Sequence, residues 1–108
     1  MKENKESKLT LTEVLNYYEK KLNDIHSNIN TQYDSETAAQ FVEKLVNLKM
    51  NICSVKLANI LNDESHKRCN HLLEKSKHLI AYFSVFVDKA ELKKILENDR
   101  SEELLNLF

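Results

Sequence analysis

The stretch that decides the fold is residues 69–87, which read CNHLLEKSKHLIAYFSVFV. Its first half repeats apolar residues at helical spacing, and its second half, residues 79–87, is apolar almost throughout. A helix that is apolar on all sides is buried in a core or in an interface. Aromatic and β-branched residues also favour strands, but the rest of the sequence offers no partner strand. We therefore predict that this stretch is a helix and that the rest of the chain covers it.

The composition agrees with an all-α protein. The chain has 108 residues, of which none is Gly or Pro, 42% are hydrophobic and 31% are charged. Tight β-hairpins usually need Gly, and Gly and Pro punctuate most β-rich sequences. A chain of this length forms one domain. We expect residues 1–9, which alternate charges, to be a flexible tail and residues 10–108 to be that domain.

Two long helices are expected before the deciding stretch. Thr10 and Glu13 match a capping box, which predicts that the first helix begins there. Its apolar residues follow a heptad spacing: Leu11, Leu15, Tyr18, Leu22, Ile25 and Ile29. The second helix is expected over about residues 36–61, capped by Asp34 or Ser35. At that length it would be about 39 Å long.

The break before the third helix is expected at residues 62–65. Asn62 suits a left-handed cap of the second helix, and Asp63 suits the N-cap of the third. Since neither Gly nor Pro is present, one continuous bent helix is the alternative.

Short helices are expected at the C-terminal end. Asp88 and Glu91 match a second capping box, which predicts a fourth helix over about residues 89–98. A further start is expected near Asp99. The predicted fold is an all-α antiparallel bundle of three long helices plus one or two short C-terminal helices.

No motif in the sequence indicates catalysis. Gly-rich phosphate loops, nucleophile elbows and paired His–Glu metal motifs do not occur. His66, Cys69 and His71 lie close together, but with Cys53 or His78 they do not form the four-ligand spacing of a structural zinc site. We expect a non-enzymatic protein without cofactor or metal, whose two cysteines are unpaired.

A basic stripe supports an alternative function. Five residues of the third helix share one face: Lys67, Arg68, His71, Lys75 and His78. Such a face can contact phosphates, so a nucleic-acid-binding regulator is the alternative. The net charge of −1 gives no overall attraction to nucleic acid or anionic lipid.

The aromatic residues of the deciding stretch support the leading function. Tyr82 and Phe83 are about 100° apart on a helix, so they need more than one packing partner. Either other helices of this chain or a second chain covers them, and aromatic residues are favoured in interfaces. The predicted partner-binding residues are Tyr82, Phe83, Phe86, Leu104, Leu107 and Phe108.

The leading hypothesis is a protein–protein interaction module. It would act as a small regulator, inhibitor or adaptor that occupies a partner protein, with homodimerisation as a second arrangement. The N-terminal residues lack the apolar region of a secretory signal, and the longest apolar run is too short to span a membrane. We therefore expect a cytoplasmic protein that does not bind membranes. The size and composition also suit a phage or mobile-element protein, which would act inside its host cell.

Overall fold

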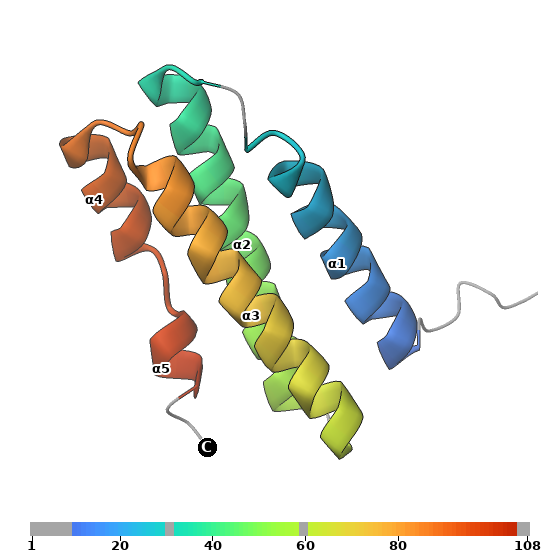
Figure 1. Ribbon diagram of the computed structural model, residues 1–108. Coiled ribbons are helices and arrows are strands. Elements are labelled where there is room, and N and C mark those ends of the chain that lie inside the picture. The colour runs from blue at the N-terminus through green and yellow to red at the C-terminus, as the bar shows by residue number, and fades with distance from the viewer. Residues whose placement is uncertain (1–9, 30–31, 59–60, 106–108) are drawn as a thin grey trace, which may run out of the picture.

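The computed structural model describes residues 10–29, 32–58 and 61–105, and all regular structure in these ranges is helical (Figure 1). The helices are α1 (Leu11–His26), α2 (Ser35–Ala58), α3 (Asp63–Ser84), α4 (Lys89–Glu97) and α5 (Ser101–Leu105). The prediction of an all-α fold is confirmed. The molecule is elongated, with extents of 48 × 32 × 23 Å.

The first helix begins with the predicted capping box. The Thr10 hydroxyl accepts the backbone N–H of Glu13 at 3.1 Å, and the Glu13 carboxylate accepts the backbone N–H of Thr10 at 2.9 Å. These hydrogen bonds with Thr10 favour the ionised carboxylate and lower the pKa of Glu13. Two of the free amides at the start of α1 are therefore satisfied by residues that could be identified from sequence.

The break between α2 and α3 differs from the expectation. The second helix ends at Ala58 rather than at residue 61, and residues 59 and 60 lie outside the described ranges. Asn62 is the N-cap of α3, since its side-chain oxygen accepts the backbone N–H of Ser65 at 2.8 Å. Its backbone is extended, with φ −78° and ψ 174°, so the expected left-handed conformation is wrong. Asp63 is the first residue of α3, where its negative charge favours the helix dipole.

The third helix ends three residues earlier than the apolar run. Val85 is its C-cap, and the backbone N–H groups of Val85, Phe86 and Val87 each donate to the carbonyl three residues back. Asp88 then caps α4 by accepting the backbone N–H of Ala90 at 3.2 Å. A capping box would direct the N–H of Asp88 to Glu91, but the Ser35 hydroxyl accepts it at 2.8 Å. This bond joins the beginning of α4 to the beginning of α2.

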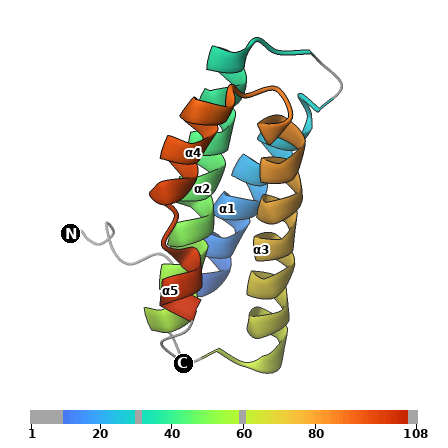
Figure 2. The ribbon, with the colours of Figure 1, turned by 90° about the vertical axis from the view of Figure 1, so that its left-hand side faces the viewer.

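The second and third helices form the centre of the molecule. Their mutual packing is the most extensive of any helix pair, and α1 packs mainly against α3. Figure 1 shows the chain running in opposite directions in successive long helices, with α1 on one side of the α2–α3 pair and α4 on the other. Figure 2 shows α4 and α5 one after the other along α2, and both pack against it. The largest fully buried apolar side chains are Phe83, Leu15, Leu22, Leu45, Ile52, Leu72 and Leu79.

A polar contact holds α5 against α2. The Lys49 ammonium lies 2.9 Å from Oδ2 of Asp99, and the two side chains are only 11% and 15% exposed. The other carboxylate oxygen, Oδ1, accepts the backbone N–H of Ser101 at 2.9 Å and its hydroxyl at 2.5 Å. Burial raises the pKa of Asp99, but the bonds with Ser101 and Lys49 outweigh it, so the pKa is lowered. The contact is therefore strongest when the carboxylate is ionised.

In the part of the chain that the structure describes, no helix combines the length and apolar character needed to cross a membrane.

Candidate partner-binding surface

Phe83 lies in the core rather than on the surface. Its side chain is fully buried, and its ring stacks on Phe41 of α2 with 4.9 Å between centroids and 20° between planes. The Tyr33 ring lies 5.5 Å away in a tilted arrangement. Phe83 is therefore a core residue that packs the end of α3 against α2, although it was among the aromatic residues predicted to bind a partner.

Tyr82 and Phe86 lie at the edge of this aromatic cluster. Both are partly exposed and pack against the core. Their centroids are 5.5 Å apart, and Phe86 lies 6.4 Å from Tyr33. The Tyr82 hydroxyl donates to the backbone carbonyl of Ile29, which follows α1. The two rings are thus held in place while part of each faces solvent.

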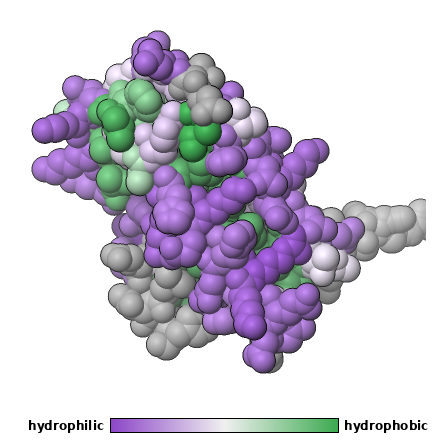
Figure 3. All heavy atoms as spheres, viewed as in Figure 1, coloured by the Kyte–Doolittle hydropathy of each residue, from purple (hydrophilic) through white to green (hydrophobic). Residues whose placement is uncertain are grey.

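Val85 is the most exposed large apolar side chain of those described, with 79% of its surface accessible. Ala81, one turn earlier, is also exposed. We call these two residues, together with Tyr82 and Phe86, the α3-end surface. Figure 3 shows apolar atoms gathered at this end of the molecule, where α3 passes into α4. Sequence reasoning did not single out Val85, because the end of α3 at Ser84 is what exposes it.

The C-terminal part of the predicted site is separate. Leu104 in α5 is partly buried and packs against the core. Leu107 and Phe108 lie outside the described residues. Of the predicted partner-binding residues, Tyr82 and Phe86 are the two that lie together on the α3-end surface.

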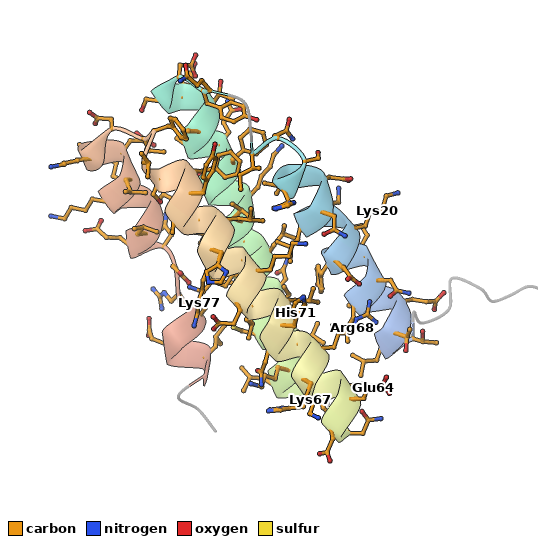
Figure 4. All side chains as sticks on the ribbon, viewed as in Figure 1. Lys20, Glu64, Lys67, Arg68, His71 and Lys77 are labelled. Atoms are coloured by element: carbon orange, nitrogen blue, oxygen red, sulfur yellow. The ribbon has the colours of Figure 1, made fainter. Side chains whose placement is uncertain are left out.

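Two cations of the predicted basic face are engaged with α1. Arg68 Nη2 lies 2.8 Å from the Glu19 carboxylate and also donates to the Asn16 side chain. Lys75 donates to the Asn23 side chain. Figure 4 shows Arg68 directed toward α1. The other three residues of this face are exposed: Lys67, His71 and His78.

These α1 contacts change how the basic face can be used. An Arg or Lys that already has an acceptor loses part of that interaction when it binds a phosphate. Glu64 and Glu74 are exposed on the same helix and repel phosphates. Nucleic-acid binding stays a prediction, with weaker support than the α3-end surface.

The cysteines and histidines do not form a common site. Cys53 and Cys69 are buried and unpaired, and burial raises the pKa of each thiol. His66 and His71 are exposed. Within residues 10–29, 32–58 and 61–105, no three His, Cys, Asp or Glu side chains are grouped so that they could hold a metal ion.

Two open grooves flank α2. One, between α2 and α4, has an acidic lining that includes Glu36, Asp88 and Glu91. Asp88 and Glu36 belong to the beginnings of α4 and α2, where carboxylates favour the helix dipole. The other groove, between α1 and α2, is lined by residues that include the partly exposed Phe41 and the exposed Lys44. Neither lining contains a cysteine or a histidine.

No protein-family model matches the chain, and no curated protein or solved structure matches it. The function is therefore inferred from the surfaces of the molecule itself.

Proposed function

We propose that this chain is a non-enzymatic protein–protein interaction module, built as an antiparallel bundle of three long helices with short C-terminal helices. It acts as a small regulator, inhibitor or adaptor by binding a partner through the α3-end surface. The observation that carries this proposal is the 79% exposure of Val85, which directly precedes the partly exposed Phe86 and follows the partly exposed Tyr82 by three residues.

The α3-end surface has the physical properties of a binding site. Burying a Val side chain in an interface contributes up to about 1.5–3 kcal/mol. Tyr82 and Phe86 add aromatic area with few rotatable bonds, which lowers the entropic cost of binding. Because Phe83 is stacked on Phe41 directly beneath, the surface is held in one geometry before the partner arrives.

The thiols support a non-enzymatic role. A nucleophilic cysteine needs a lowered pKa and access to its substrate. Cys53 and Cys69 are buried, and burial raises the pKa of each thiol. The raised pKa and the lack of access both indicate that these cysteines are small residues of the core.

We propose that the protein acts in the cytoplasm, or in the interior of a host cell if a phage encodes it.

The test compares two charge-introducing variants in cells of the source organism. Partners are captured with the wild type, with Val85→Glu and with Lys20→Glu, which changes an exposed residue on α1 far from the α3 end (Figure 4). We expect a partner that Lys20→Glu retains and Val85→Glu loses. Equal capture by both variants would refute the assignment of this surface. Light scattering on the same three proteins shows whether the partner is a second copy of the chain.

A further inference from the structure

Two stretches of the chain that line one groove share a sequence pattern. In each, a Lys is followed by Asp or Asn at i+3, by Ile or Leu at i+4 and by Asn at i+7. The first set comes from α1 and the turn after it: Lys21, Asp24, Ile25 and Asn28. The second set comes from α2: Lys44, Asn47, Leu48 and Asn51. We call the space that they line, together with Phe41, the α1–α2 groove. Its volume is about 440 Å³, which is within the range of ligand sites.

The shared pattern gives the α1–α2 groove two similar walls. Leu22 and Leu45 directly follow the two lysines and are fully buried, so both helices are rotated to present the same set of positions to the groove. Since α1 and α2 run in opposite directions (Figure 1), the Lys of each wall lies toward the Asn end of the other. The groove therefore has one cation and one carboxamide toward each end.

The floor of the groove is apolar and held in place. Ile25 is buried, and Phe41 and Leu48 are partly exposed. The Phe41 ring stacks on Phe83, with 4.9 Å between their centroids. The floor is therefore arranged to receive apolar side chains before a partner arrives.

The carboxamides of the α2 wall have the spacing of an extended backbone. Asn47 and Asn51 are exposed, and within the described ranges neither side chain has a hydrogen-bond partner. They are four residues apart, which is about 6 Å along a helix, and alternate residues of an extended chain are about 6.4–6.8 Å apart. A carboxamide accepts a backbone N–H and donates to a backbone C=O. The two side chains can therefore bind alternate residues of one extended segment.

An extended peptide also fits the relation between the walls and the floor. In an extended chain, side chains point to the two faces, whereas N–H and C=O groups point sideways. With its side chains on the floor, the peptide turns its backbone groups toward the carboxamides of the walls. A helix in the same place has its backbone groups already paired. A second copy of the chain is disfavoured for the same reason, because all regular structure in its described ranges is helical.

The charges of the groove favour a peptide that carries carboxylates. The described lining holds Lys21 and Lys44 against a single carboxylate, Asp24. Neighbouring carboxylates are engaged elsewhere, since Glu19 forms an ion pair with α3 and Glu43 lines the groove between α2 and α4. A carboxylate toward each end of the bound peptide complements the two lysines.

We propose that the α1–α2 groove binds a short extended peptide of a partner protein, with apolar side chains on the floor and a carboxylate toward each end. From Phe41 to Asn51 the groove follows α2 for about 15 Å, which is the length of about five extended residues. This is a second site, on different helices from the α3-end surface, and it does not depend on the function proposed for that surface.

The test uses short labelled peptides as probes and fluorescence anisotropy as the readout. The first probe is Ser-Glu-Val-Thr-Leu-Glu-Ser with blocked ends, and the second has lysines in place of its glutamates. The third is the first probe with N-methyl groups on the Val and Leu amides, which removes two backbone donors and keeps the side chains. In the control for the third probe, the N-methyl groups are on the two serines.

We expect the wild type to bind the glutamate probe saturably and roughly tenfold more tightly than the lysine probe. Methylation of the Val and Leu amides should weaken binding roughly tenfold, whereas methylation of the serine amides should change it less than about twofold. The absence of saturable binding of the glutamate probe, or equal binding of the two N-methylated probes, would overturn the proposal.

A pair of carboxamide variants locates the site on α2. Asn47→Ala/Asn51→Ala should weaken binding of the glutamate probe roughly tenfold. Its control is Gln40→Ala/Asn70→Ala, which removes two exposed carboxamides outside the described lining of the groove and should bind like the wild type. Unchanged binding in the first variant, or an equal loss in the control, contradicts the proposal.

A pair of charge variants tests the lysines. Lys21→Glu/Lys44→Glu should remove or reverse the preference for the glutamate probe. Lys20→Glu/Lys94→Glu changes the net charge equally at exposed positions outside the described lining and should keep the preference. Circular dichroism checks that every variant folds. If the first variant keeps the preference, or if both lose it equally, the lysines do not bind the peptide and the proposal fails.

Val85→Glu separates this site from the α3-end surface. It should bind the glutamate probe like the wild type, because Val85 lies outside the described lining of the groove. Loss of binding in Val85→Glu with retention in Asn47→Ala/Asn51→Ala would remove the groove and assign the peptide to the α3-end surface. The proposed function is tested by partner capture with Val85→Glu, so the two proposals fail in different measurements.

Discussion

Phe83 and Val85 are two residues apart, yet the structure predicts opposite consequences when each is shortened to Ala. Phe83 is fully buried between helices, whereas 79% of the Val85 surface is accessible. Phe83→Ala should destabilise the fold, and Val85→Ala should leave it almost unchanged while weakening partner binding.

The magnitude for Phe83 follows from its surroundings. Replacing a buried Phe with Ala costs about 3–5 kcal/mol, because apolar surface is lost and a cavity is left. The stacked contact with Phe41 and the contact with Tyr33 place the variant in the upper half of that range, since aromatic pairs contribute about 0.5–1.5 kcal/mol beyond burial. We expect a loss of about 4 kcal/mol, against a total of about 5–15 kcal/mol for a typical domain.

The assay is urea unfolding followed by circular dichroism, with the free energies extrapolated to water. Val85→Ala is the matched control and should change the free energy of unfolding by less than about 0.5 kcal/mol. A loss below about 1 kcal/mol in Phe83→Ala would refute the placement of Phe83 in the core. A comparable loss in Val85→Ala would refute the exposed position on which the proposed function depends.

Three further predictions concern other parts of the chain. Asp99→Asn should cost about 1–3 kcal/mol at neutral pH, because it leaves a mostly buried lysine without its counter-charge. Since the pKa of Asp99 is lowered by folding, its contribution is present above its unfolded pKa of about 3.9 and disappears as the pH falls through the folded pKa. Urea unfolding measured from pH 7 to pH 2 should therefore show that the free energy of unfolding falls less with acid in the variant than in the wild type. Thr10→Ala should destabilise α1 by about 1 kcal/mol through loss of its cap, and hydrogen exchange in the first turn should accelerate more than in Thr12→Ala. Cys53 and Cys69 are buried with raised pKa values, so a thiol reagent should modify them no faster than the native protein unfolds locally to expose them. Rapid modification of the native protein would contradict their burial.

Local signals in the sequence predicted the helices well where one short motif decides the structure. The capping box at Thr10 is satisfied within four residues and needs no contact with the rest of the chain. One prediction failed because a distant residue competes. Asp88 was expected to begin a capping box, but its backbone N–H bonds to Ser35, which is 53 residues away in the sequence.

The same distinction explains the candidate site. Spacing correctly grouped Arg68 and Lys75 on one side of α3, but it could not show that Glu19 and Asn23 of α1 would face them. Val85 was part of an apolar run that was expected to be helical and enclosed. The turn that begins after Ser84 brings it to the surface, and no motif in the sequence marks that turn.

The arrangement of α1 and α4–α5 on opposite sides of α2 and α3 also has a consequence for the way the molecule opens. Each side packs on the central pair without depending on the other, so each can detach while the rest stays folded, as a separate unit of local unfolding. α1 is held by a narrow apolar row and a few polar bonds to α3, whereas α5 is held by the Lys49–Asp99 pair. Hydrogen exchange in the native protein should therefore show the amides of α1 and of α4–α5 opening as two separate groups, both faster than the central amides of α2 and α3.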